Sequence, residues 1–251
     1  MDYFISQIPL FAALLAAFVA FAILERIYQP AQLSITFRSP TTEVSVAVFL
    51  YLILVAFSVF VFWQAGSHAP PKSETVPNGY TFVQALFQLF ANAMSFLPFG
   101  IALLIRKQGL KTIGISKHNI SLSIIGGIIA SLIASLLFSQ PSLQFWLSAS
   151  TAFLFIAQLG VGLSEEAIFR GYLLLRFSTY FKRNTAELFT ALMFALVHIP
   201  QRLFNKSTVT ELVVDLGILF LWGWVFNVIM HRTSNIAGLA LLHSVINVVG
   251  A

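Results

Sequence analysis

Five ionisable side chains lie in otherwise apolar stretches of the second half of this 251-residue chain. Three of them, Glu165, Glu166 and Arg170, fall within a single apolar segment, and His198 and His243 are each flanked by apolar residues on both sides. An ionisable group at membrane depth costs about 2.5 to 3.5 kcal/mol on insertion scales, so such groups are functional or paired with one another. These five residues are therefore the first candidates for chemistry.

Their spacing separates a paired glutamate from a free one. Glu166 and Arg170 are four residues apart with the acid first, which is the favourable order for an ion pair on a helix. We expect this pair to have a structural role. Glu165 projects about 100° away around the helix and is not compensated by that arginine. His243 and Asn247 are also four residues apart, so they share one helix face.

One carboxylate and two imidazoles, in a chain without cysteine, indicate the activation of water. A buried glutamate is a competent general base near neutral pH, and a neutral histidine can share the water or donate to an oxyanion. The Asn247 amide would add a neutral donor to the oxyanion. Glu165, His198 and His243 could instead hold a divalent metal such as zinc with an open water position. The cofactor is therefore either none or a divalent metal.

The composition places these groups in a membrane protein. Hydrophobic residues make up 58% of the chain and charged residues only 9%, against roughly a quarter in soluble proteins. The lack of cysteine excludes a disulfide framework, a thiolate metal site and a cysteine nucleophile. The 14 basic residues are scattered between apolar runs and form no basic face for nucleic acid. We expect a multi-pass integral membrane protein, in the plasma membrane if the source is bacterial.

Apolar runs predict an all-α bundle of about eight transmembrane helices. The first four runs are long, whereas those of the second half are shorter or interrupted by charges. The eight runs cover residues 8–24, 44–63, 82–105, 120–138, 145–162, 186–199, 212–230 and 236–249. Residues 1–144 form N-terminal helices without a catalytic motif, and residues 145–251 form the helical core that carries the candidate site. Both parts belong to one integrated membrane domain.

Basic residues in the short loops predict the orientation. With eight helices, ten of the fourteen fall on one side, which we expect to be cytoplasmic, and both termini lie on the other side. Only Lys72, Arg202 and Lys206 fall with the termini. The ten are Arg26, Arg38, Arg106, Lys107, Lys111, Lys117, Arg176, Lys182, Arg183 and Arg232.

The same topology predicts that the candidate groups meet. At 1.5 Å per residue from the nearest cytoplasmic charge, Glu165 and His243 lie about 16 Å deep and His198 about 22 Å deep. Three separate helices therefore deliver these side chains to similar depth.

Other polar residues allow structural as well as functional interpretations. Gln84, Gln88 and Asn92 form one stripe, which is either the wall of a cavity or a set of hydrogen bonds between helices, the latter being more common. We expect Phe194 to pack beside the histidine that follows it and Asn227 to hydrogen-bond to another helix.

Three motifs appear in order along the second half: EExxxR at residues 165–170, FxxxH at 194–198 and HxxxN at 243–247. Each motif alone is weak, but their order on predicted membrane helices is specific. Together with the run Gly223–Trp224–Val225–Phe226, they resemble the CPBP family. This family comprises CAAX prenyl proteases and bacteriocin-processing enzymes and is also called the Abi family of intramembrane proteases. The resemblance covers Phe145 to Ala251.

The resemblance implies hydrolysis of a peptide bond inside the membrane. Glu165 matches the residue that activates water, with His198 assisting, and His243 and Asn247 match positions that stabilise the oxyanion. The second glutamate and the arginine of the first motif match a structural or orienting pair. Family members have been described as metalloproteases by analogy, although the glutamate mechanism needs no metal. The partner implied is a membrane-associated peptide or protein, either a prenylated CAAX peptide or a leader or pheromone peptide.

Two other functions are compatible with the same residues. Buried glutamates and histidines also carry protons in transporters, although no inverted repeat of broken helices is visible here. A catalytically silent scaffold or immunity protein would act by binding partners, but it would have no need for Glu165 and His198 together.

Overall fold

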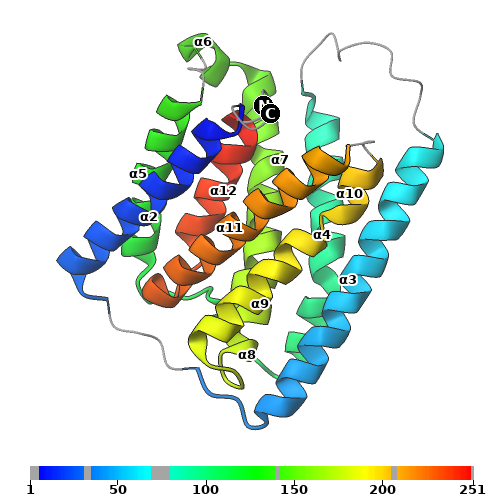
Figure 1. The fold of residues 1–251 in the computed structure, drawn as a ribbon, viewed down its shortest axis with the longest axis vertical. Coiled ribbons are helices and arrows are strands. Elements are labelled where there is room, and N and C mark those ends of the chain that lie inside the picture. The colour runs from blue at the N-terminus through cyan, green and yellow to red at the C-terminus, as the bar shows by residue number, and fades with distance from the viewer. Residues whose placement is uncertain (1–5, 31–34, 69–79, 139–141, 205–207, 250–251) are drawn as a thin grey trace.

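The computed structural model describes residues 6–30, 35–68, 80–138, 142–204 and 208–249, and these residues form helices and loops without strands. Eight long helices correspond to the eight predicted runs, so the prediction of an all-α bundle is confirmed (Figure 1). They are α2 (Ile8–Tyr28), α3 (Pro40–His68), α4 (Phe82–Ile105), α5 (Ile120–Leu137), α7 (Ala149–Glu166), α9 (Arg183–Leu196), α11 (Val209–Thr233) and α12 (Ala237–Val249).

Six spans are long and apolar enough to cross a membrane, as a multi-pass integral membrane protein requires. The fifth of them extends over Ala149–Phe177, and the expectation that it ends near residue 162 is wrong. Inside this longer span, Glu166 pairs with Arg170 and Arg176 pairs with Glu43, so three of its charged residues are compensated within the bundle. Short elements connect the long helices: η1 (Leu110–Ile113), α6 (Leu143–Trp146), η2 (Ala167–Leu174), α8 (Leu175–Phe177) and α10 (Ile199–Phe204).

The segment η2 is wound as a π-helix rather than the expected α-helix. All eight of its residues are buried, and it follows the two glutamates of the first motif directly. Its Gly171 lies so close to the backbone carbonyl of Ile113 that a methyl group there would collide with it. Turns of π-helix are rare and are frequently found at functional sites.

Helix α12 packs between α5 and α7 through glycines (Figure 1). Gly127 of α5 faces the backbone of Gly238, which is the close approach that small residues allow between membrane helices. On α7, a Cβ atom at Gly162 would lie 2.5 Å from the Ala240 carbonyl oxygen and 2.6 Å from Ser244 Oγ. The two backbones can therefore approach only because residue 162 has no side chain.

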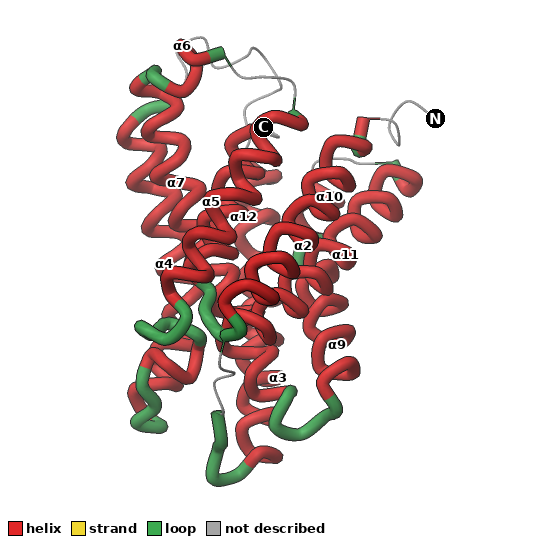
Figure 2. The backbone as a smooth tube through the Cα atoms, turned by 90° about the vertical axis from the view of Figure 1, so that its left-hand side faces the viewer, coloured by secondary structure: helices red, strands yellow, loops and turns green. Residues whose placement is uncertain are grey.

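Ion pairs join the helices at the end of the bundle where the basic residues gather. Glu43 of α3 is buried and binds Arg106 at 2.5 Å and Arg176 at 3.2 Å. Glu25 of α2 binds Arg232 of α11 at 2.6 Å. Figure 1 shows that α6 lies at the opposite end of the bundle from α8, and Figure 2 shows α6 at the same end in the turned view. Of the cations expected on that opposite side, Lys72 and Lys206 lie outside the described residues.

A histidine at the basic end also contacts a carboxylate. His231 Nδ1 lies 2.7 Å from Glu187 Oε1, and its Nε2 lies 3.0 Å from Ser178 Oγ. Ser178 Oγ also donates to the Leu174 carbonyl at 2.7 Å, and none of the three polar side chains lines either cavity described below. This set connects α11 to α9 and to the turn after α8.

The predicted orientation can be tested because the chain contains no cysteine. We expect Lys111→Cys, at the basic end, to resist a membrane-impermeant maleimide in intact cells. Gln144→Cys, on α6, should react, since both positions are exposed and at opposite ends. Labelling after permeabilisation is the control, and the reverse pattern in intact cells would invert the topology.

The glycine contact of α7 predicts a stability difference. Gly162→Ala places a methyl group against the Ala240 carbonyl and should destabilise the protein by about 1 to 3 kcal/mol. Gly217→Ala on α11, where no atom lies within 4 Å of the added Cβ, should be neutral or stabilising. Thermal unfolding in detergent measures both, and equal melting temperatures would contradict the packing described here.

Candidate active site

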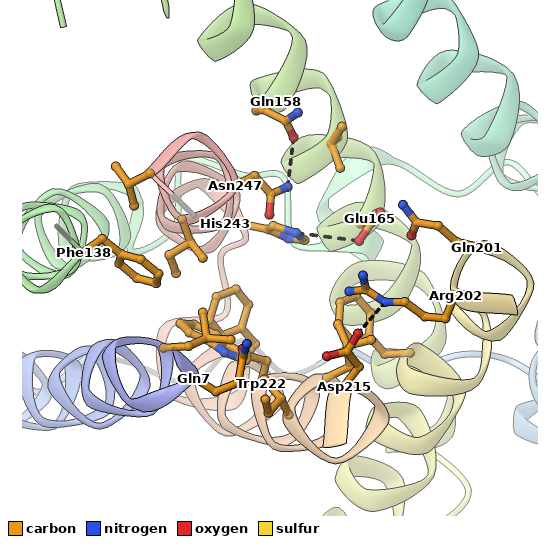
Figure 3. Close-up of a pocket in the computed structure, with 18 of the residues that line it drawn as sticks. Gln7, Phe138, Gln158, Glu165, Gln201, Arg202, Asp215, Trp222, His243 and Asn247 are labelled. Atoms are coloured by element: carbon orange, nitrogen blue, oxygen red, sulfur yellow. Dashed lines mark hydrogen bonds and ion pairs between the residues drawn. The ribbon is translucent and has the colours of Figure 1, made fainter. Parts of the chain in front are cut away.

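Glu165, His198 and His243 come together in the middle of the bundle, as their expected depths suggested. Glu165 lies at the end of α7, His198 in the turn between α9 and α10, and His243 in the middle of α12. Glu165 Oε2 is 4.0 Å from His198 Nε2 and 3.8 Å from His243 Nε2. Figure 3 shows Glu165 and His243 pointing toward one another. The three side chains are 13 to 25% exposed, so they lie at the surface of an internal space.

Glu166 orients His243. Its Oε1 accepts from His243 Nδ1 at 2.8 Å and from Arg170 Nη1 at 3.1 Å, and its side chain is fully buried. Because a carboxylate can only accept, Nδ1 carries the hydrogen, which leaves Nε2 directed at Glu165. The expected ion pair between Glu166 and Arg170 is present, but its histidine partner was not predictable from local spacing.

Aromatic rings surround the arginine of this pair. The Arg170 guanidinium lies 4.3 Å from the ring centroid of Phe194 and 5.1 Å from that of Phe226. These contacts are cation–π interactions, which are strengthened when the cation is removed from water. The Phe194 ring also contacts that of His198 at 4.9 Å, as its expected packing role requires.

The peptide backbone orients His198. Its Nδ1 donates to the Phe194 carbonyl at 2.7 Å, because a carbonyl oxygen can only accept. The other ring nitrogen, Nε2, therefore faces Glu165. Both histidines thus use Nδ1 for a fixed hydrogen bond and present Nε2 to the same carboxylate, but only His243 is anchored to a charged group.

Asn247 lies one helical turn after His243 and has a partner on another helix that was not predicted. Asn247 Nδ2 donates to Gln158 Oε1 of α7 at 3.0 Å (Figure 3). Gln158 precedes Glu165 by seven residues, which is about two turns of helix and hence the same face. That spacing was the available signal in the sequence.

A cavity of about 780 Å³ contains Glu165, His243 and Asn247. One wall is polar and is supplied by α4, α7 and α10. The other is mixed: apolar side chains from α2, α11, α12 and the residue after α5 stand beside Asp215, His243 and Asn247. The polar lining includes Gln88, Asn92, Gln158, Gln201 and Arg202, and the apolar lining includes Leu10, Phe138, Ile218, Trp222 and Ile246.

A smaller cavity of about 200 Å³ lies between α3 and α4 and reaches Glu165 and His198. Gln88 and Asn92 line both cavities, so the cavity-wall interpretation applies to these two members of the polar stripe. Gln84 has another role, because it forms a capping box with Thr81 at the start of α4. Helices of the N-terminal half, which carry no motif, therefore supply walls of the candidate site.

Arg202 and Asn227 each connect two helices of the second half. Arg202 lines the larger cavity and forms an ion pair with Asp215 of α11 at 3.1 Å, a contact that was not anticipated. Asn227 donates through Nδ2 to the Glu187 carbonyl at 2.7 Å, which confirms its role as a hydrogen bonder between helices.

The donor set of one carboxylate and two imidazoles has the chemistry of a zinc site, but its geometry does not fit. Tetrahedral coordination at about 2.0 to 2.1 Å would bring the donor atoms to about 3.3 Å from one another. Glu165 Oε2 lies 3.8 and 4.0 Å from the two Nε2 atoms. Within the part of the chain that the structure describes, no group of three or more His, Cys, Asp or Glu residues is arranged to hold a metal ion.

Comparison with known proteins supports the interpretation of the motifs. Residues 146–249 match the family model of the type II CAAX prenyl endopeptidases that are Rce1-like. No curated protein and no solved structure matches the chain. The matched segment contains all three motifs and the helices that bring their side chains together. Residues 146–249 are thus similar to the Rce1-like type II CAAX prenyl endopeptidases, in agreement with the resemblance to the CPBP family.

Proposed function

We propose that this protein is an intramembrane endopeptidase in which Glu165 activates the water that hydrolyses a peptide bond. The observation that carries the proposal is the convergence of Glu165 Oε2 with two imidazole Nε2 atoms beside a cavity among membrane-spanning helices. The family match supports protease activity in general. The assignment of the individual residues rests on their geometry.

The distances around Glu165 suit one shared water molecule. Glu165 Oε2 lies 3.8 Å from His243 Nε2 and 4.0 Å from His198 Nε2, and both distances are too long for direct hydrogen bonds. A water with two hydrogen bonds of about 2.8 Å at a right angle joins atoms about 4.0 Å apart. Such a water donates one hydrogen to Glu165 and another to an imidazole, which leaves an oxygen lone pair for attack.

The different anchors of the two histidines suggest different roles. The Glu166 carboxylate on Nδ1 stabilises the protonated ring of His243, whose Nε2–H then donates to an oxyanion. His198 is anchored to a neutral carbonyl and keeps an unprotonated Nε2, which accepts from the water. Asn247 provides the second donor to the oxyanion.

Hydrolysis then proceeds in two steps. Glu165 takes a proton from the water as its oxygen bonds to the scissile carbonyl carbon, and His243 and Asn247 stabilise the resulting oxyanion. The carbon–nitrogen bond breaks as the intermediate collapses, and Glu165 returns the proton to the leaving amine. The products are a carboxyl terminus and an amino terminus.

The two walls of the cavity indicate a membrane-associated peptide as substrate. The side formed by α11 and α12 offers Ile218, Trp222 and Ile246 to apolar groups, while the opposite side offers amides to a peptide backbone. A prenylated CAAX peptide and an apolar leader or pheromone peptide both have this character. An assay should therefore include both, each with a fluorophore and quencher on either side of the cleaved bond.

We expect Glu165→Gln to lower kcat by about 10² to 10⁴, because it removes the general base and keeps the shape of the side chain. The matched control is Glu211→Gln, at the start of α11, where glutamine can also form the capping box. Cleavage by purified protein in detergent is the measurement, and melting temperatures verify folding. Unchanged cleavage by folded Glu165→Gln would refute the proposed base.

The metal-free mechanism predicts that removing metal has no effect. Protein purified and assayed with 1,10-phenanthroline should cleave at the wild-type rate, and elemental analysis should find less than stoichiometric zinc. A membrane-permeant chelator is required because the site lies within the bundle. Stoichiometric zinc that is lost in His198→Ala, together with inhibition that added zinc reverses, would establish a metal mechanism instead.

A further inference from the structure

We infer that Gln158 is a positioning residue, which holds the Asn247 amide in the orientation that donates to the oxyanion. This inference rests on the proposed function. Gln158 Oε1 accepts from Asn247 Nδ2 at 3.0 Å, and both side chains line the larger cavity (Figure 3).

The need for a positioning group follows from the chemistry of an amide. The terminal torsion of an asparagine side chain is broad and roughly two-fold, so a half turn exchanges its NH₂ group for its carbonyl oxygen. Only the NH₂ group stabilises an oxyanion, whereas the carbonyl oxygen repels one. With one Nδ2 hydrogen bound to Gln158, the second hydrogen is still available for the reacting carbonyl.

Gln158 belongs to a regular seam between α7 and α12. Residues 158, 162 and 166 recur every four positions on α7 and so share one face. Gln158 binds Asn247, Gly162 faces Ala240 and Ser244, and Glu166 binds His243.

The seam gives each proposed oxyanion donor its own support from α7. Its central glycine brings the backbones together, and the two polar residues on either side of it hold His243 and Asn247. Gln158 therefore plays the same part as Glu166: Gln158 orients the amide of Asn247, and Glu166 orients the imidazole of His243. Because Glu165 is on the same helix, the base and both supports are placed by one rigid element.

The experiment compares Gln158→Met, which retains length but has no acceptor, with wild-type protein on whichever quenched peptide the wild type cleaves. We expect kcat to fall about 10- to 100-fold with KM within about twofold, since a lost oxyanion donor costs about 10² to 10³. Gln158→Asn, whose acceptor oxygen lies one methylene farther from Asn247, should likewise lower kcat and leave KM nearly unchanged. Gln144→Met, at an exposed position of α6 that lines neither cavity, is the matched control and should be unaffected.

A double variant shows whether Gln158 acts through Asn247. On an Asn247→Leu background, Gln158→Met should cause no further loss of kcat, because the group that it positions is absent. A folded Gln158→Met or Gln158→Asn protein with wild-type kcat would overturn the inference. An undiminished further loss on the Asn247→Leu background would also overturn it.

These outcomes separate the inference from the function on which it rests. If the wild type cleaves and Glu165→Gln does not, normal kcat in the Gln158 variants refutes only the positioning role. If the wild type cleaves neither class of peptide, the proposed function itself fails.

Discussion

The buried carboxylate of Glu166 is the contact on which the candidate site depends. A bilayer offers no water to a charged group, so a carboxylate at this depth must find its partners within the protein. Glu166 finds two, Arg170 on its own helical segment and His243 on α12. The arginine compensates its charge, and the histidine obtains a fixed orientation from it. The same interaction therefore compensates the buried charge and orients the imidazole of His243 toward Glu165.

This contact requires that α7 and α12 lie close together, and the glycines make that possible. A side chain at residue 162 would collide with α12, and side chains at residues 127 or 238 would collide across the contact between α5 and α12, which holds α12 in place from its other side. Close packing in membranes relies on such small residues, because apolar side chains gain little by leaving lipid for another helix. The precision of the site thus originates in residues that carry no chemistry themselves.

The N-terminal helices complete the site rather than merely surrounding it. Leu10 of α2 and Phe138 beside α5 line the apolar part of the larger cavity, and Gln88 and Asn92 of α4 line the polar part. The ion pairs of Glu43 and Glu25 fasten α3 and α2 to the second half. The helices without motifs therefore contribute side chains to the larger cavity beside those of the motif helices.

The sequence by itself determined the helical class and singled out the residues of the candidate site. Hydrophobic runs locate helices because a helix that spans lipid must have a certain length and an apolar composition. Glu165, His198 and His243 were conspicuous because so few ionisable residues lie within such runs. The four-residue spacing also identified the pair of Glu166 and Arg170, since both members lie on one helix.

Only the tertiary structure decided the partners that lie far apart along the chain. Glu166 is 77 residues from His243 and Gln158 is 89 residues from Asn247, and no local periodicity relates such positions. The π-helical winding after Glu166 and the cavity walls from α4 were likewise invisible in the sequence, because they arise where helices meet. Local spacing fixes which side chains share a face of one helix, but close packing between helices decides which faces meet.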